Sequence, residues 1–127
     1  MSTPFRANPT IHVCDNERLL RELVRASLDS SYEIVEASDG NESLRLARET
    51  QPDLIILDLE MPGKSGLEVL AELRADPHLT ETPVVLLTAH AQAADRLAGV
   101  EAGADLYLTK PFSPLELARA VAELVRG

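Results

Sequence analysis

The chain has 127 residues, which is enough for one domain with a single hydrophobic core. Apolar residues make up 45% and charged residues 26%, the profile of an ordinary globular protein, and no apolar stretch is as long as a membrane span. The net charge of −9 argues against a nucleic-acid surface, because contact with phosphate backbones requires clustered Lys and Arg. The single cysteine, Cys14, excludes an intrachain disulfide and favours a reducing compartment, so we expect a cytoplasmic protein without a membrane partner.

Residues 1–9 are expected to form a short polar N-terminal tail, because this segment lacks the apolar core of a signal peptide. Residues 10–127 are expected to form one domain. The sequence leaves open whether the natural chain continues past Gly127.

Five short apolar runs alternate with five amphipathic stretches. The apolar runs predict strands over residues 10–14, 32–37, 53–57, 83–87 and 104–109. The amphipathic stretches predict helices over residues 16–28, 40–50, 65–75, 91–102 and 113–125. Regular alternation of strands and helices predicts an α/β fold in which helices cover both faces of a parallel sheet.

The first two helical stretches carry different signals. One buried stripe is predicted on the first helix, formed by Leu19, Leu20, Leu23, Val24, Ser27 and Leu28. Before the second helix, Asp39 and Glu42 have the spacing of a capping box. Both patterns indicate helices that pack on a sheet.

The last two helical stretches differ in their expected hold on the sheet. The fourth has mostly alanine on its inward face, together with Leu97 and Val100, so we expect it to be the least firmly held. The fifth opens with Ser113 as the N-cap, a proline at the first helical position and Glu116 three residues after the cap.

The strand compositions predict the strand order. Residues 53–57 and 83–87 are continuously apolar, as in strands that are buried on both faces. The second strand instead carries Glu33 and Glu36, and the fifth contains Asp105, as edge strands would. We therefore expect a doubly wound, five-stranded parallel sheet of order 2-1-3-4-5, which is the flavodoxin-like arrangement.

Polar residues stand at the carboxyl ends of four predicted strands: Asp15, Asp58, Thr88 and Lys110. In a parallel sheet these ends lie along one edge, and ligands bind there at the point where the winding reverses. With order 2-1-3-4-5 that point lies between the first and third strands, which carry Asp15 and Asp58. We therefore expect the four side chains to converge on one crevice.

The chemistry of this set points to phosphate and magnesium. Two neighbouring carboxylates repel each other unless a cation neutralises them, and a few hard oxygen ligands suit Mg²⁺. Lys110 and Thr88 can supply a charge and a donor around a phosphoryl group. Asp58 is ionised at neutral pH and can act as a nucleophile without a base, which would make it the site of an acyl phosphate.

The segments "CDNERLLR", "PDLIILDLEMPGKSGLEVL", "TPVVLLTAH" and "GADLYLTKPFSP" carry these residues. Over residues 10–126 the chain resembles the receiver domains of bacterial two-component response regulators of the CheY-like type. The resemblance implies that Asp58 accepts a phosphoryl group from a histidine kinase or a phosphotransfer protein. It also implies that Asp15, Asp58 and the backbone carbonyl of Glu60 bind Mg²⁺.

The resemblance extends to the response that follows phosphorylation. It implies that Lys110 contacts a phosphoryl oxygen, that Thr88 moves towards another and that Tyr107 turns inward. It further implies a cis Lys110–Pro111 bond. The surface of the fourth helix, fifth strand and fifth helix would then act on an output domain or partner protein. Such a domain is a signalling element, whose only reactions are its own phosphorylation and dephosphorylation.

The chain departs from the family at Cys14. The family usually carries two adjacent acids at the end of the first strand, and here only the second, Asp15, remains. In the family the first acid acts mainly through water, so the direct metal ligand is retained. As a residue in its own right, Cys14 is expected to be a small buried hydrophobe.

Two other functions are compatible with parts of the pattern. The first is a receiver-like interaction module that is not phosphorylated, which Cys14 favours but the retained Asp58, Thr88 and Lys110 oppose. The second is a small Mg²⁺-dependent phosphatase in which Glu60, two residues after the nucleophile, acts as the acid. A chain of 127 residues leaves no room for the cap domain that such an enzyme requires.

Single residues have competing interpretations. Tyr107 can be a switch or simply pack at an edge strand, and His90 can lie at the pocket mouth or in a solvated loop. His12 is expected to be a strand residue with a satisfied ring nitrogen. On the surface of the fourth helix, fifth strand and fifth helix, Arg96, Asp105 and Glu116 resemble part of the charge set by which transcription-factor receivers dimerise. Leu106 and Ala120 depart from that set, and Leu106 is expected to be an exposed apolar contact.

Overall fold

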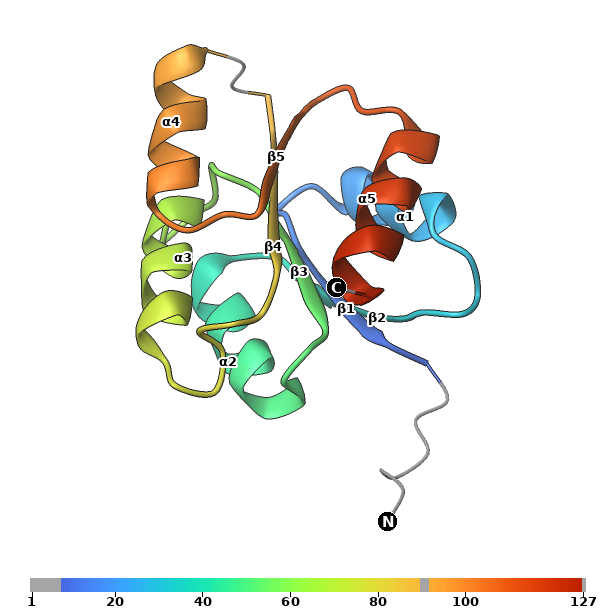
Figure 1. The fold of residues 1–127 in the computed structure, drawn as a ribbon, viewed down its shortest axis with the longest axis horizontal. Coiled ribbons are helices and arrows are strands. Elements are labelled where there is room, and N and C mark those ends of the chain that lie inside the picture. Colours follow the sequence, from blue (N-terminus) through green and yellow to red (C-terminus); the bar gives the residue numbers. More distant parts are fainter. Residues whose placement is uncertain (1–7, 90–91, 127) are drawn as a thin grey trace.

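The structure is a computed structural model that describes residues 8–89 and 92–126. Within them, the strands are β1 (Thr10–Cys14), β2 (Glu33–Ala37), β3 (Leu54–Leu57), β4 (Val84–Thr88) and β5 (Leu106–Thr109). The helices are α1 (Arg18–Ser27), α2 (Gly40–Thr50), α3 (Gly66–Ala75), α4 (Ala93–Glu101) and α5 (Pro114–Arg126), as Figure 1 shows. The five strand–helix units are confirmed. His90 and most of the expected tail over residues 1–9 lie outside the described residues.

The strands form one parallel sheet of order β2-β1-β3-β4-β5, which confirms the predicted order. At the carboxyl ends, Cys14 pairs with Ala37 of β2 and with Leu57 of β3, and Thr88 pairs with Thr109. The chain reverses its direction of winding between β1 and β3, so these two strand ends frame the crevice where ligands bind in such sheets.

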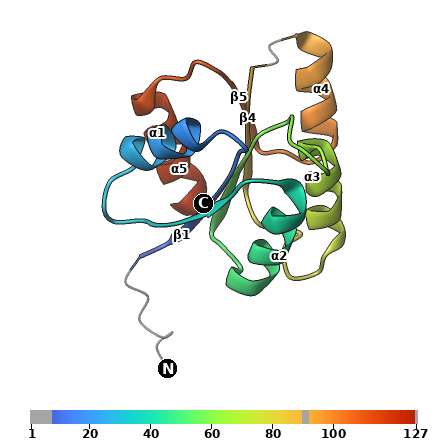
Figure 2. The ribbon, with the colours of Figure 1, turned by 180° about the vertical axis from the view of Figure 1, so that it is seen from behind.

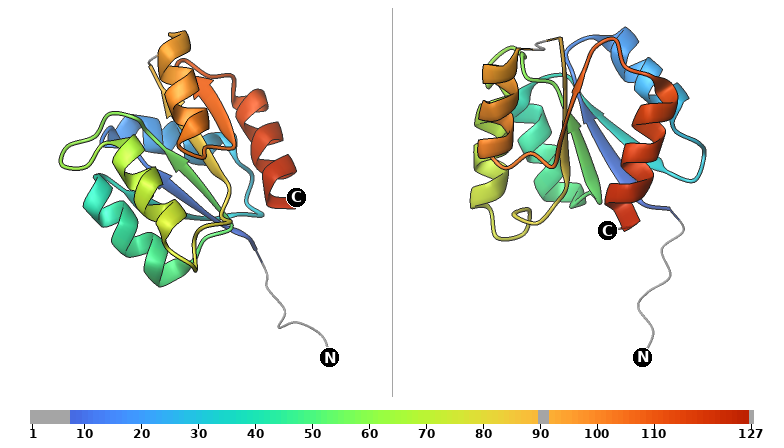
Figure 3. Two further views of the ribbon diagram at one scale, coloured as in Figure 1. Left: turned by 60° about the vertical axis from the view of Figure 1, so that its left-hand side comes forward. Right: turned by 45° about the horizontal axis from the view of Figure 1, so that its top comes forward.

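Helices cover both faces of the sheet. Helices α1 and α5 lie on one face, and α2, α3 and α4 lie on the other, as seen from the front, from behind and from two further directions (Figures 1, 2 and 3). Successive side chains of β3 point to opposite faces of the sheet and pack in both hydrophobic cores. Leu54 and Ile56 pack on the α1–α5 side, whereas Ile55 and Leu57 pack on the other side. All four side chains are buried, as the continuous apolar run predicts.

Side-chain caps fix the starts of three helices. The backbone N–H of Glu42 donates to Asp39 at 2.8 Å, and that of Glu116 donates to Ser113 at 3.2 Å, so both expected caps are present. Ser65 and Glu68 form a full capping box at α3. Within residues 8–89 and 92–126, no helix combines the length and apolar character that crossing a membrane would require.

The predicted stripe on α1 is too wide. Leu19 is 79% exposed and Leu23 is 46% exposed, whereas Val24 and Leu28 are buried. The six positions span half of the helix circumference, and only the side that includes Val24 and Leu28 reaches the sheet. Leu19 and Leu23 therefore form an exposed pair one turn apart.

The predicted inward face of α4 is wrong in its two large residues. Leu97 is 59% exposed and Val100 is 58% exposed. The helix approaches the sheet through Gly99, where an added Cβ would lie 2.7 Å from Leu86 Cδ1 and 3.1 Å from Tyr107 Cδ2. This close approach is made at Gly99, while Leu97 and Val100 face outward.

Candidate functional site

The four polar residues predicted to converge lie at neighbouring strand ends. Asp15 follows β1, Asp58 follows β3, Thr88 ends β4 and Lys110 follows β5. Backbone hydrogen bonds join these ends: Asp58 N–H donates to the Cys14 carbonyl at 2.9 Å, and Lys110 N–H donates to the Thr88 carbonyl at 2.7 Å. The Lys110–Pro111 peptide bond is cis, as the resemblance implied. The strand order thus brings residues far apart in sequence to one edge of the sheet.

A pocket of about 340 Å³ opens at this edge. Its lining residues come from all four strand ends: Asn16, Glu17, Asp58, Glu60, Thr88, Ala89 and Lys110. Asp58 is 6% exposed and Thr88 is 1% exposed, so both are nearly inaccessible. Small Ala89 follows Thr88 at the wall, as expected for a site that must admit a further group.

Lys110 is the cation of this pocket. Its Nζ lies 3.0 Å from Asp15 Oδ2, 3.4 Å from Asp58 Oδ2 and 3.7 Å from Glu17 Oε1. Burial opposes its charge, but the hydrogen bond that Lys110 donates to Asp15 and the charges of both aspartates outweigh burial and raise the pKa of Lys110. The other lysine, Lys64, pairs instead with Glu72 of α3. Lys110 therefore stays charged at neutral pH.

The two carboxylates of the pocket differ in their support. Asp15 is 3% exposed, and it accepts a backbone hydrogen bond from Glu17 at 2.8 Å in addition to that from Lys110. Asp58 accepts a longer one from the backbone N–H of Glu60, at 3.4 Å. Burial, followed by repulsion from Asp15, raises the pKa of Asp58 to about 6 although Lys110 lowers it. The pocket holds more negative charge than Lys110 alone offsets.

The donor set fits a hard divalent cation. Among the described residues no cluster of three or more His, Cys, Asp and Glu side chains is placed to hold a metal, so the available side-chain ligands here are Asp15 and Asp58. Two carboxylates and the carbonyl of Glu60, with water completing the shell, is the kind of set that Mg²⁺ accepts. A cation there would relieve the repulsion that raises the pKa of Asp58.

Tyr107 occupies an inward position in this structure. It is 7% exposed and belongs to the core on the α2–α3–α4 side, beside Gly99 of α4. A movement of β4 or α4 would therefore change the packing around the Tyr107 ring. Its role as a switch stays a prediction.

Cys14 is a buried hydrophobe, as expected. It is 1% exposed, and its Sγ lies 3.1 Å from Met61 Sδ and 3.5 Å from the Asp39 carbonyl oxygen. Burial raises the pKa of Cys14 to about 12, so the thiol is protonated at neutral pH.

His12 is fully buried, and only one ring nitrogen is satisfied. Nε2 lies 3.1 Å from Ser43 Oγ, as the expectation of a satisfied nitrogen requires. Nδ1 has no hydrogen-bond partner among the residues that the structure describes. Burial lowers the pKa of His12 to about 4, so the ring is neutral near pH 7.

A more voluminous pocket lies elsewhere, beside β5 and α5, and has a volume of about 530 Å³. It is lined by Asp105, Leu106, Leu108, Ser113, Leu115, Glu116, Arg119, Ala120, Glu123 and Leu124. Leu106, expected to be exposed, is half-buried and forms part of this wall. Asp105, proposed as part of a dimerisation set, instead pairs with Arg74 at 3.1 Å.

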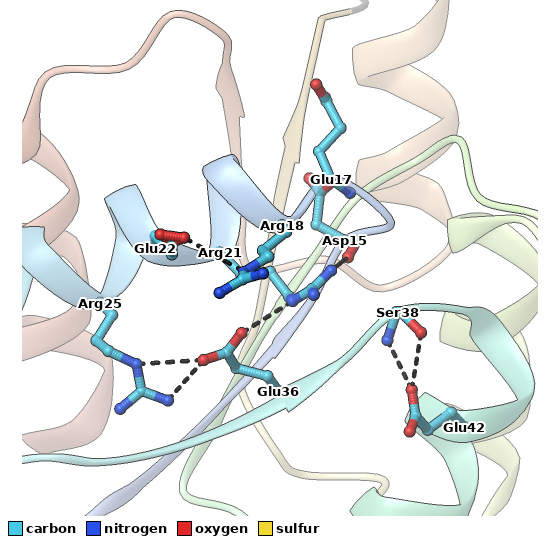
Figure 4. A network of polar contacts seen from close by, with 9 residues as sticks. All are labelled: Asp15, Glu17, Arg18, Arg21, Glu22, Arg25, Glu36, Ser38 and Glu42. Atoms are coloured by element: carbon cyan, nitrogen blue, oxygen red, sulfur yellow. Dashed lines mark hydrogen bonds and ion pairs between the residues drawn. The ribbon is translucent and has the colours of Figure 1, made fainter.

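The sequence interpretation missed Arg21 of α1. Its guanidinium donates to the carbonyl oxygen of Asp15 at 2.5 Å and to Glu36 Oε1 at 2.9 Å, as Figure 4 shows. The available signal was a pair of arginines one helical turn apart, Arg21 and Arg25, together with an acid on the edge strand β2. Nothing in that pattern indicates a backbone carbonyl as the second partner.

Comparison with known proteins gives a consistent picture. A family model described as response regulator receiver domain matches residues 11–122. The transcriptional regulatory protein ResD of Bacillus subtilis is 43% identical over 117 residues, which cover 91% of this chain and 48% of ResD. The phosphate regulon transcriptional regulatory protein PhoB of Pseudomonas aeruginosa is 36% identical over 118 residues, which cover 92% of this chain and 52% of PhoB. The chain spans about half the length of these curated relatives.

A solved structure has the same fold. The chemotaxis protein CheY4 of Vibrio cholerae, crystallised at low pH, superimposes with a TM-score of 0.86 at 30% identity. The match covers 93% of this chain and 99% of the CheY4 chain. The likeness therefore extends over nearly the whole chain.

Proposed function

Because the chain belongs to the response-regulator receiver family of two-component signalling systems, we propose that it is a phosphorylation-dependent switch with Asp58 as its acceptor. The observation that carries this proposal is the pocket itself. Asp58 stands at its wall with Lys110 Nζ 3.4 Å from its Oδ2, and the same nitrogen lies 3.0 Å from Asp15 Oδ2. Residues 10–127 would form the receiver domain.

Five residues at this edge of the sheet have a part in the proposed transfer. A carboxylate oxygen of Asp58 attacks the phosphorus of a phosphohistidine on a kinase or phosphotransfer protein. The new P–O bond forms as the P–N bond breaks, and the imidazole leaves with the electron pair. Lys110 pairs with an oxygen of the phosphoryl group, and the Thr88 hydroxyl donates to another. Asp15, Asp58 and the Glu60 carbonyl would hold Mg²⁺, which offsets phosphoryl charge when bound.

Phosphorylation would be transmitted through α4 and Tyr107. The phosphoryl group adds negative charge beside Thr88, and movement of that side chain changes the space next to Tyr107. Because α4 packs closely against the Tyr107 ring at Gly99, a movement of the ring should shift the helix as well. The responding surface would be α4, β5 and α5. Its target would be an output domain or a separate protein, since the curated relatives are about twice as long.

Direct phosphorylation tests the assignment of Asp58. Incubation with acetyl phosphate and Mg²⁺ should add one phosphoryl group that is labile to base, and Asp58→Asn should abolish the addition. Asp53→Asn is the matched control, because Asp53 precedes the opposite end of β3 and bonds to the backbone of Thr10 at 2.7 Å. Equal modification of the Asp58→Asn protein would refute the assignment.

Amide exchange tests the proposed transmission. Addition of a beryllofluoride phosphoryl mimic should change exchange most across residues 88–107, with the readout taken at the described positions. Changes confined to α1 and α2 would contradict the route through Thr88 and Tyr107.

One observation favours a second function, an interaction module that is not phosphorylated. Cys14 replaces the first of the family's two acids and packs against Met61, which reduces the negative charge available for Mg²⁺. An unmodified Asp58 after prolonged incubation with acetyl phosphate and Mg²⁺ would support this alternative. A phosphatase is not proposed, because the family is one of signalling domains.

A further inference from the structure

We infer that Arg21 is a positioning residue for the Mg²⁺ site, because it fixes the backbone that carries the Asp15 carboxylate. This inference rests on the proposed function of that site. Arg21 lies on α1 and its side chain is 14% exposed, so its guanidinium is largely withdrawn from water. Its guanidinium donates to Glu36 and to the Asp15 carbonyl, whereas its backbone N–H donates to the carbonyl of Glu17 at 3.2 Å as part of the first helical turn.

The backbone of Asp15 is held from both sides. Its N–H donates to the carbonyl of Ala37 at 3.1 Å, which continues the β1–β2 ladder by one residue. Its own carbonyl accepts from Arg21 at 2.5 Å. The peptide between Asp15 and Asn16 therefore cannot rotate without breaking the contact with Arg21.

That peptide sets the direction of the Asp15 carboxylate. Oδ1 accepts from the backbone N–H of Glu17, two residues on, at 2.8 Å, and this local turn depends on the orientation of the intervening peptides. Oδ2 is thereby directed at Lys110 Nζ, 3.0 Å away. Loss of the Arg21 contact would free the turn, and Asp15 would spend less time in the direction that a shared cation requires.

Arg21 is itself held by the edge strand. Its Nε donates to Glu36 Oε1 at 2.9 Å, while Arg25 binds the other oxygen, Oε2, at 2.6 Å (Figure 4). Arg25 is half exposed, and among the described residues its guanidinium pairs with Glu36 and not with Asp15. The two arginines thus lie on the same helix, carry the same charge and pair with the same acid, but only Arg21 also contacts Asp15.

Positioning and simple electrostatics predict opposite results. If Arg21 acted only as a nearby positive charge, its removal would favour Mg²⁺ and tighten binding. If it positions Asp15, its removal weakens binding. The sign of the change in affinity therefore separates the two roles, and general loss of stability does not by itself produce that sign below the melting temperature.

The experiment is a calorimetric Mg²⁺ titration of the full chain, carried out well below the melting temperature of each variant. Arg21→Met, which keeps a long helix-forming side chain, should weaken Mg²⁺ binding by about 10-fold, the lower end for partners that orient a metal ligand. Arg25→Met removes the same charge from the same acid and should bind Mg²⁺ like the unchanged chain. Arg21→Lys keeps the charge but lacks the planar guanidinium that bonds two partners at once. Its Mg²⁺ affinity should therefore lie between those of the unchanged chain and of Arg21→Met.

Equal or tighter Mg²⁺ binding by Arg21→Met would overturn the inference, and so would an equal weakening in Arg25→Met. If Arg21→Met does not fold, Arg21→Lys decides, because unchanged affinity in that variant overturns the inference and weaker binding supports it. No Mg²⁺ binding by the unchanged chain would instead overturn the proposed function, and this inference with it.

Discussion

Oδ2 of Asp58 lies 3.4 Å from Nζ of Lys110, and yet the pKa of Asp58 is raised to about 6. Burial and then repulsion from Asp15 outweigh the attraction of the lysine. The metal-free protein therefore carries a carboxylate that is less stable ionised in the folded state than in the unfolded state. This conflict fits a site that a cation would complete by offsetting the negative charge.

Asp58→Asn should consequently stabilise the metal-free protein. The folded state binds the Asp58 proton more tightly, so the penalty appears as pH rises from about 4 to about 6 and is fully present above that interval. Above pH 7 we expect a gain of roughly 1–2 kcal/mol, discounted for the open pocket mouth. Urea unfolding with a chelator present measures it. Mg²⁺ should reduce the difference in stability between the two proteins, because it stabilises the one that retains the Asp58 carboxylate as a metal ligand.

Asp76→Asn is a suitable control for this measurement. Asp76 is a surface acid whose pKa is lowered, mainly by the backbone N–H of His78. Neutralising it should not stabilise the protein. A clearly lower metal-free stability of Asp58→Asn would contradict the repulsive pocket.

His12 should make the protein sensitive to acid. Its pKa falls from 6.5 in the unfolded chain to about 4 in the folded one, because burial disfavours the charged ring. The unfolded state binds the proton first, so stability is lost as pH falls from about 6.5 to about 4, by up to about 3 kcal/mol. Asp58 changes stability in the opposite direction over an overlapping interval. The test is therefore best made in an Asp58→Asn background.

In that background, His12→Gln should lack the loss between pH 6.5 and pH 4, as read from urea midpoints. The exposed His78 supplies the matched control, since His78→Gln should leave the loss in place. An identical pH profile with and without His12 would show that another group is responsible.

Gly66 should be intolerant of a side chain. It begins α3, and a Cβ there would overlap the Asp58 carbonyl oxygen and lie 2.8 Å from Leu59 Cα. Both are backbone atoms and cannot turn aside as a side chain can. We expect Gly66→Ala to destabilise the protein by about 1–3 kcal/mol and to slow phosphorylation by acetyl phosphate, since Asp58 must move.

Gly99→Ala provides the contrast. The atoms that its Cβ would meet belong to the side chains of Leu86 and Tyr107, which can shift. We expect changes in amide exchange in α4 with little effect on phosphorylation by acetyl phosphate. Normal phosphorylation of Gly66→Ala would show that the β3–α3 connection adapts more freely than the close contact indicates.

Much of this architecture follows from local sequence patterns. The continuously apolar runs of β3 and β4, the glutamates of β2 and Asp105 just before β5 were sufficient for the strand order. That order placed Asp15, Asp58, Thr88 and Lys110 at one edge. These inferences succeed because a strand that is buried on both faces is continuously apolar, whereas an edge strand keeps polar residues.

The inward faces of α1 and α4 were harder to predict. Hydrophobicity alone favours leucine over glycine on a buried face, but at α4 the close approach of backbone to sheet selects Gly99 and leaves Leu97 outside. The contact of Arg21 with a backbone carbonyl was also beyond reach, because every residue carries that group and no sequence pattern marks the one that is used.

The replacement at Cys14 leads to the last prediction. An acid at this position would add negative charge beside the site and an acceptor for metal-bound water. Outer partners of this kind are worth about 10–100-fold in metal affinity, and we expect Cys14→Asp to tighten Mg²⁺ binding at the lower end of that range. Acetyl phosphate should then phosphorylate the variant faster at limiting Mg²⁺, and the two proteins should converge at saturating Mg²⁺.

The same substitution should lower stability when Mg²⁺ is absent. The Cys14 thiol packs 3.1 Å from Met61 Sδ, and burial raises the pKa of Cys14 to about 12. A buried anion at this position is therefore destabilising. Cys14→Asn is the matched control, because it has the shape of the aspartate without its charge and imposes the same repacking on Met61. Calorimetric titration of the three proteins separates charge from packing. Unchanged or weaker Mg²⁺ affinity in Cys14→Asp, or equal tightening in Cys14→Asn, would mean that the missing acid does not explain the affinity of this site.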